Sequence, residues 1–196
     1  MRPPVQWLLD STATAAAFAE NGCLDSLGAN QLGRALYPGL FSRGRQPGNW
    51  ARFVFFNPEA RSFYADWDRA AKDCVAILRS EAGRSPHDRE LSDLVGELAT
   101  QSEEFRGLWA AHNVRLHTKG VKRFNHPIVG ELELSFNRLQ LSADPGLMIV
   151  AYTAEPGSRS ADALGLLASW AATEEDGTHP SDAGAHQRGG NAPSSH

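Results

Sequence analysis

The sequence is poor in cysteine and contains no long apolar run, and each shortage excludes a class of protein. Cys23 and Cys74 are the only cysteines among 196 residues, which is too few for a disulfide framework. They form no C-x-x-C pair, so a zinc–thiolate site is not indicated. No apolar run approaches the roughly 20 residues that a membrane-spanning helix needs. We therefore expect reduced thiols, no metal, no membrane segment and a cytoplasmic location.

A strongly basic field is also missing. The 19 Lys and Arg residues face 23 Asp and Glu residues, which gives a net charge of −4. A chain with this balance is not expected to bind nucleic acid by itself, since such binding depends on neutralising phosphates. The opening segment MRPPVQWLLD has neither a long apolar core nor a small-residue cleavage site, so it does not indicate a signal peptide.

The last part of the chain lacks large apolar side chains. Residues 171–196 contain no Val, Ile, Leu, Met, Phe, Trp or Tyr. Such a segment cannot bury enough apolar surface to offset the entropy of ordering. We therefore predict one domain over residues 1–170 and a disordered polar tail over 171–196. The tail histidines are expected to be solvated.

Turn and capping signals organise the first quarter of the chain. Asn21-Gly22 lies between two short apolar segments and predicts a two-residue hairpin turn within residues 14–29. Asn30 is placed to cap a short helix that ends near Tyr37. The aromatic stretch 50–56 predicts a short buried helix.

Helical spacing then continues over three segments. Asn57-Pro58-Glu59 predicts the start of a helix that runs to about Gly83, with one apolar stripe. A second helix is predicted to begin at Ser85-Pro86, with Pro at the first position. Ser102 is predicted to cap a third helix, which carries Phe105, Trp109 and His112.

The period changes to two at Val114 and indicates strands. Residues 114–118 alternate, Lys119-Gly120 is predicted as a turn, and residues 121–124 as the returning strand. Residues 128–136 alternate again, but Leu139 and Leu141 fall out of phase, which predicts either a bulge near Asn137-Arg138 or the end of the strand. The apolar residues 147–153 predict a central strand, and Ser160 is placed to cap a last helix.

This order of elements predicts the α+β class. Strands separated by a block of helices, without βαβ alternation, favour one antiparallel sheet with the helices on one face. Strands divided by inserted helices are also typical of the PAS architecture. We therefore expect a PAS-like antiparallel sheet with an inserted set of helices.

Signals of catalysis are weak. The sequence contains no Gly-rich phosphate loop and no G-x-S-x-G motif. Three histidines, His112, His117 and His126, are close in sequence, but the strand pattern directs His117 to the polar side, which argues against a shared metal. His112 is either a core histidine or the polar group of an apolar cavity. His126 is either a turn residue or a residue at the mouth of a pocket.

Aromatic residues are dense between positions 50 and 67 and recur on the third helix. Such stripes form either core or the apolar walls of a small-molecule pocket. For the pocket interpretation, the predicted ligand-binding residues are Phe53, Phe56, Tyr64, Trp67, Phe105 and Trp109 as walls, with His112 and His126 for a polar head group.

Taken together, six segments resemble the MmyB-like ligand-binding domain. They are PVQWLLD, NGCLDSLGANQLGRALY, NWARFVFFNPEARSFYADWDRAA, SEEFRGLWAAHNVR, HPIVGELEL and AYTAEPGSRSADALGLLASW. The resemblance covers residues 4–170 and implies the C-terminal, PAS-like domain of a bacterial transcription regulator. It implies a fatty-acid-like ligand, a homodimer, and DNA binding through an N-terminal helix-turn-helix. That helix-turn-helix is absent from this chain, which is expected to be either truncated or a stand-alone sensor.

Two other interpretations stay open on the sequence. The domain could serve only to dimerise the regulator, with the aromatic residues as packed core and no ligand. It could also be a small enzyme that uses His112 and His126, although the sequence places no nucleophile or carboxylate near either. We expect no cofactor and no catalytic residue in the leading interpretation.

Overall fold

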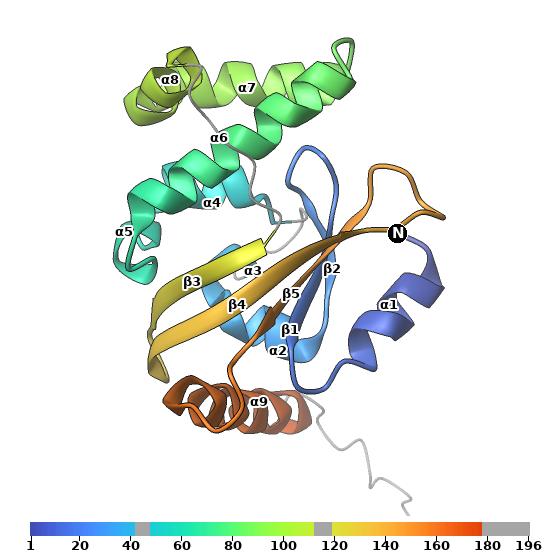
Figure 1. Cartoon of the computed structure of the whole chain (residues 1–196), viewed down its shortest axis with the longest axis vertical. Coiled ribbons are helices and arrows are strands. Elements are labelled where there is room, and N and C mark those ends of the chain that lie inside the picture. The colour runs from blue at the N-terminus through green and yellow to red at the C-terminus, as the bar shows by residue number, and fades with distance from the viewer. Residues whose placement is uncertain (42–47, 112–118, 178–196) are drawn as a thin grey trace, which may run out of the picture.

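One open antiparallel sheet of five strands forms the centre of the molecule (Figure 1). The computed structural model describes residues 1–41, 48–111 and 119–177. Within these ranges the strands follow the order β2-β1-β5-β4-β3. Their bounds are β1 Ala16–Glu20, β2 Ser26–Ala29, β3 Lys119–His126, β4 Gly130–Gln140 and β5 Met148–Thr153.

Helices surround this sheet. Figure 1 shows α4 to α8 gathered at one end of the molecule and α9 at the other. The described helices are α1 Pro3–Asp10, α2 Gln31–Leu36, α3 Pro38–Phe41, α4 Trp50–Phe56, α5 Ala60–Phe63, α6 Trp67–Arg84, α7 Arg89–Gln101, α8 Glu103–Ala110 and α9 Arg159–Gly177. The predicted α+β class is confirmed, with two strands before the block of helices and three after it. The apolar strand β5 is central, as predicted.

The two faces of the sheet bury different amounts of apolar surface. The main core joins the inner face, which includes Phe18 and Tyr152, to helices α2, α4, α6, α8 and α9. A smaller cluster on the other face contains Val5 and Leu9 of α1, packed against Ala17 and neighbouring residues of β1 and β5. Helix α1 therefore covers part of the face opposite the main helical layer, a placement that the sequence did not indicate.

The first hairpin forms where it is predicted, but its turn is longer. Five residues, Asn21 to Asp25, join the two strands, instead of the two-residue Asn-Gly turn. The side chain of Asn21 accepts a hydrogen bond from the Asp25 N–H at 2.8 Å, which closes the longer loop. Leu24 in this turn has a positive φ of 64°, unusual for a branched side chain.

The predicted long helix over residues 57–83 is divided in two. Tyr64 adopts an extended conformation and forms an isolated bridge with Phe124 of β3. The Ala65 N–H donates to the Arg123 carbonyl at 3.1 Å. Asp66 then caps α6 by accepting from the Arg69 N–H at 3.0 Å. The break lets residues 64 and 65 pair with the edge strand β3 and cover it. This tertiary pairing overrides the helical spacing of the sequence.

Two capping predictions are confirmed, but the last helix and the second helix of the inserted block begin elsewhere than predicted. Asn30 accepts from the Gly33 N–H at 2.7 Å, and Ser102 accepts from the Phe105 N–H at 3.1 Å. The predicted helix at 50–56 is α4. Helix α7, in contrast, begins at Arg89, where Asp88 is the cap, and not at Ser85-Pro86. Helix α9 begins at Arg159, where Ser158, and not Ser160, accepts from the Ala161 N–H at 3.1 Å.

The strands after the helices differ from the prediction at two positions. Residues 119 and 120 belong to β3 and pair with β4, so they form no turn. The predicted strand over 114–118 and the position of His117 lie outside the described residues. Strand β4 pairs with β5 in unbroken register from Ser135 to Gln140, so the strand has neither the predicted bulge near Asn137-Arg138 nor its end there. Leu139 is out of phase because it is exposed, whereas Arg138 points inward.

The last helix extends beyond the predicted domain boundary at Trp170. Helix α9 continues to Gly177, Ala171 is buried, and the Gln31 side chain donates to the Ala171 carbonyl at 2.9 Å. The remainder of the predicted tail, residues 178–196, lies outside the described residues. A search of the described helices finds no stretch with the length and hydrophobicity to span a bilayer.

Candidate functional site

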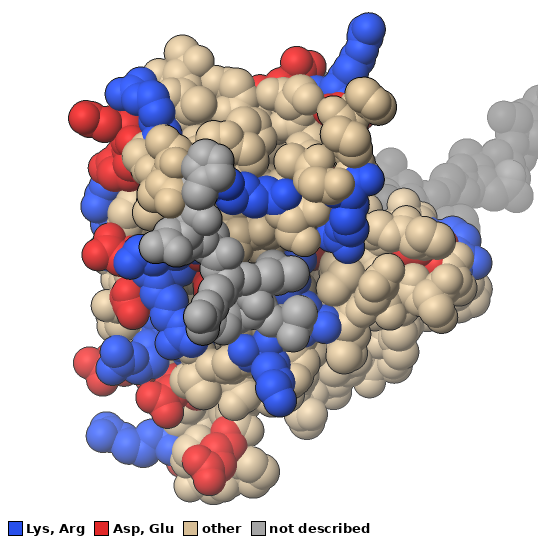
Figure 2. Space-filling model, turned by 45° about the horizontal axis from the view of Figure 1, so that its top comes forward, with Lys and Arg blue, Asp and Glu red and all other residues tan. Residues whose placement is uncertain are grey.

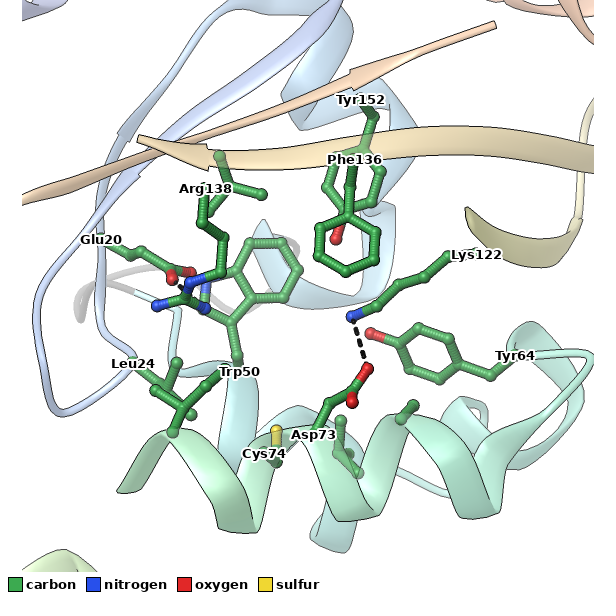
Figure 3. Close-up of a pocket in the computed structure, with 14 residues that line it drawn as sticks. Glu20, Leu24, Trp50, Tyr64, Asp73, Cys74, Lys122, Phe136, Arg138 and Tyr152 are labelled. Carbon is green, nitrogen blue, oxygen red and sulfur yellow. Dashed lines mark ion pairs between the residues drawn. The ribbon is translucent and has the colours of Figure 1, made fainter. Parts of the chain in front are cut away.

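A small cavity lies between the inner face of the sheet and helices α4 and α6 (Figure 3). Its volume is about 40 Å³, which is space for a few water molecules. Its walls combine apolar, aromatic and charged side chains. The lining residues are Glu20, Leu24, Trp50, Val54, Tyr64, Ala70, Asp73, Cys74, Ile77, Lys122, Phe136, Arg138, Val150 and Tyr152.

An ion pair closes one side of the cavity. Arg138 Nη1 lies 2.6 Å from Glu20 Oε1, and both side chains are almost fully buried, with 10% and 4% of their surfaces exposed. Glu20 Oε1 has no partner with hydrogen-bond geometry among the described residues, so charge holds this contact. Arg138 reaches this place because it continues the inward series of Leu132, Leu134 and Phe136 along β4.

A second charged pair lies on the opposite side. Lys122 Nζ is 4.0 Å from Asp73 Oδ2, with Lys122 on β3 and Asp73 on α6. Lys122 also lies over the ring of Phe136, at 5.1 Å from its centroid. A neighbouring cavity of about 40 Å³ shares Tyr64, Asp73 and Lys122 with the first. The Lys122–Asp73 pair therefore lies between two small spaces.

One buried donor in the cavity wall lacks a partner. Trp50 is 8% exposed, and its Nε1 has no hydrogen-bond acceptor among the described residues. Leaving such a donor unpaired costs about 1–3 kcal/mol, so it favours any acceptor that enters the cavity. In Figure 3 the Trp50 indole lies on the same side of the cavity as Arg138 and Glu20.

Burial changes the ionisation of these groups. Desolvation raises the pKa of Glu20, and the charges of Arg138 and Lys122 oppose that rise. Desolvation would lower the pKa of Lys122, but surrounding acidic groups, Tyr152 and Asp73 first among them, raise it above the usual value. Burial raises the pKa of the Cys74 thiol to about 12, so this cysteine is not an activated nucleophile.

The predicted ligand-binding aromatics belong to one core or pack against it, and the rings of Phe53 and Tyr64 lie 6.1 Å apart. Tyr64 lines the cavity. Phe53 and Phe105 are buried in the main core, and Phe56 is partly buried against it. Trp67 donates from Nε1 to the Val54 carbonyl at 3.0 Å.

Trp109 belongs to a separate stack on α8. Its ring lies 5.5 Å from that of Phe105, and the Arg79 guanidinium covers it at 4.8 Å. Of the predicted aromatic walls, Tyr64 is thus the one that the described cavity includes.

The histidines do not meet in a described site. His126 is 2% exposed, its Nε2 lies 3.0 Å from the Ala35 carbonyl, and its Nδ1 faces the N–H groups of Ile128 and Val129 at 3.3 and 3.4 Å. These contacts fit a neutral ring protonated at Nε2 that fixes the turn between β3 and β4. His112 lies outside the described residues.

The charged residues of the cavity were missed from the sequence. Strand periodicity could have indicated two of them. Lys122 is two residues before the buried Phe124, and Arg138 is two residues after the buried Phe136, so each falls on the inward face of its strand. The change of phase at Leu139 and Leu141 instead predicts a bulge near Asn137-Arg138 or the end of the strand. Glu20 and Asp73 carry no such signal.

This arrangement is suited to binding more than to catalysis. The cavity offers two cations, two carboxylates, phenol groups and an unpaired indole N–H, all held by helices and strands. Across the described ranges, no group of three or more His, Cys, Asp or Glu side chains is arranged to hold a metal ion.

Comparison with known proteins agrees with a binding role. Residues 1–167 match the family described as the MmyB-like transcription regulator ligand binding domain. A search of curated proteins finds no match.

Proposed function

The chain belongs to the family of MmyB-like transcription regulator ligand-binding domains, and on that premise we propose that it senses a small amphipathic effector in the cavity between the sheet and α4 and α6. Membership of this family points to a non-enzymatic role. The observation that carries the proposal is the cavity wall, where apolar side chains surround an unpaired Trp50 N–H and two charged pairs.

The proposed ligand is fatty-acid-like, with an acyl chain and a polar head group. The polar end would lie among Arg138, Lys122 and Trp50, and the chain would pack on aromatic side chains of α4 and α5. A cavity of about 40 Å³ is too small for an acyl chain, so binding must separate elements that now touch. A ligand that binds the open form better than the closed one shifts their populations, which is what a sensor requires.

In the proposed regulator, a helix-turn-helix outside this chain contacts DNA in the cytoplasm. The charge pattern supports this division of roles. Basic and acidic side chains are interspersed over the face that Figure 2 turns forward, so this face offers no uniformly basic surface for phosphates. The PAS-like character that we propose for the fold rests on the sheet and on the helices inserted between β2 and β3.

We also propose that the domain forms homodimers, which would transmit the effector signal to paired DNA-binding domains. Trp7 of α1 is 68% exposed and Leu166 of α9 is 67% exposed, and packing either against a second copy would remove apolar surface from water. Sedimentation equilibrium of the chain tests this: a dimer mass supports the proposal, and a monomer at 100 μM contradicts it.

Native mass spectrometry of the purified chain tests the sensing function. We expect a stoichiometric lipid-like adduct, or a gain of thermal stability with a panel of acyl ligands. A ligand at 100 times its dissociation constant adds about 2.7 kcal/mol to the free energy of unfolding. A chain that is empty and gains no stability from any ligand would instead favour a structural module without a ligand.

A further inference from the structure

We propose that an anionic ligand replaces Glu20 as the partner of Arg138, and that Glu20 takes up one proton from solvent as the ligand binds. This inference rests on the proposed function, because it requires that a ligand enters this cavity. It adds a coupling between ligand binding and proton uptake, and it names the charged group that responds.

Charge balance in the cavity carries the argument. The side chains that line it include two cations, Lys122 and Arg138, and two carboxylates, Glu20 and Asp73, which together are neutral. A ligand carboxylate would add a third negative charge within a few ångströms. An unbalanced buried charge is costly, and when two carboxylates compete for one cation the pKa of one of them is raised. Uptake of one proton restores neutrality.

The geometry selects the Arg138 end of the cavity for the anion. Arg138 offers a planar guanidinium that can hold a carboxylate with two parallel hydrogen bonds. In the described structure its contact with Glu20 lacks hydrogen-bond geometry. The unpaired Trp50 N–H lies on the same side and provides a further donor. A ligand carboxylate can therefore pair with Arg138 and give the Trp50 indole N–H the acceptor that it lacks.

Glu20 is the carboxylate that we expect to be protonated. It is 3% exposed, and desolvation raises its pKa, whereas the Asp73 residue is 8% exposed. Protonated Glu20 is a neutral side chain that remains stable in the apolar interior. The titratable and charged groups that face Glu20 across the cavity are Arg138 of β4, Lys122 of β3, Tyr152 of β5, Asp73 and Cys74 of α6, and Tyr64 before α6.

The position of Glu20 links it to the start of α4. It is the last residue of β1, and the five-residue turn with Leu24 follows directly. Leu24 lines the cavity and its carbonyl accepts from the backbone N–H of Trp50 at 2.9 Å. Asn49 donates to the Cys23 carbonyl and to Asp25 in the same turn. Release of Glu20 would therefore act on a turn that is tied to the start of α4.

Isothermal titration calorimetry with decanoate tests the coupling. Titration at pH 7.5 in two buffers of different ionisation enthalpy measures the number of protons taken up per ligand. We expect a value close to one for decanoate and close to zero for its uncharged analogue decanol. Glu20→Gln should abolish the uptake and bind decanoate at least tenfold more tightly, because Arg138 no longer has a competing carboxylate. Glu97→Gln, which breaks an exposed pair with Arg52, is the matched control and should behave as wild type.

The possible failures are distinguishable. Decanoate binding without proton uptake in the wild-type chain overturns the inference and leaves the proposed function intact. Equal uptake in wild type and Glu20→Gln shows that another group takes the proton, which also overturns it. If neither decanoate nor decanol binds and native mass spectrometry finds no adduct, the inference and the proposed function both fail. The wild-type measurement needs no variant, so a folding defect in Glu20→Gln does not weaken the test.

Discussion

Arg138 and Glu20 form their ion pair across the central strand of the sheet. Arg138 lies on β4 and Glu20 on β1, and β5 runs between these two strands. Their charged atoms nevertheless meet at 2.6 Å on the inner face, where Val150 of β5 is the direct neighbour of Arg138. A charged contact thus lies on the buried face of the sheet, at the place where we propose that a ligand binds.

Removing one partner of this pair is expected to be costly. Arg138→Met should lower the free energy of unfolding by about 3–5 kcal/mol, because Glu20 then stays buried without a counter-charge. Combining it with Glu20→Leu should recover most of the loss, since an apolar pair of similar volume is often as stable. Urea denaturation of the two single variants and the double variant measures this. Additive losses in the double variant would show that the two residues are not coupled.

Acid should destabilise the chain through His126. Burial holds the pKa of His126 below its usual value of 6.5, while the contact with the Ala35 carbonyl opposes this. The unfolded chain therefore binds this proton first as the pH falls. The contribution of His126 is complete above pH 6.5 and is lost as the pH falls through the lower folded pKa. Between pH 7.5 and pH 5.5, the free energy of unfolding measured from denaturation curves should fall less for His126→Gln than for wild type. An equal fall in the free energy of unfolding of both proteins would show that other groups cause the pH dependence.

The division between α5 and α6 depends on a helix cap. Asp66→Ala removes the side-chain oxygen that accepts from the Arg69 N–H, and should cost about 0.5–2 kcal/mol of stability. Asp66→Ser keeps a side-chain oxygen that can accept this hydrogen bond, and should therefore retain most of the wild-type stability. Thermal unfolding of both variants checks this. An Asp66→Ala variant as stable as Asp66→Ser would indicate a continuous helix through residues 64–66.

Replacing the buried and the partly buried aromatic residue of α8 by Ala should lower the free energy of unfolding by different amounts. Phe105 is fully buried, so Phe105→Ala should cost about 3–5 kcal/mol. Trp109 is only partly buried and stacks on Phe105 beneath Arg79, so Trp109→Ala should cost less. Chemical denaturation ranks the two. Decanoate affinity of Trp109→Ala then tests whether this ring is a ligand wall, as proposed from the sequence, and an unchanged affinity would remove it from the site.

Local signals predicted much of the fold because they depend on neighbouring residues. Asn30 and Ser102 cap helices as their sequence contexts predict, and the aromatic segment 50–56 is a helix. The division at Tyr64 could not be predicted in this way. It depends on pairing with Phe124, which lies 60 positions further along the chain.

The candidate site was less predictable because its chemistry opposes the usual patterns. Aromatic density pointed to Tyr64, which lines the cavity, but most of the other predicted rings are packed core. The cavity is distinguished by charged residues at inward positions of strands, and Arg138 produced an apparent change of phase in β4. A charged residue that continues an apolar alternation is thus better interpreted as a buried polar group than as a bulge.

The indole N–H of Trp50 allows the most direct test that the cavity is the ligand site. The chain has five tryptophans, whose indole signals are resolved in a ¹H–¹⁵N spectrum and assigned by single Trp→Phe variants. On titration with decanoate, we predict that the Trp50 signal shifts as its unpaired N–H gains an acceptor, while the exposed Trp7 signal stays in place. Saturable binding that leaves the Trp50 signal unchanged would contradict this assignment of the site.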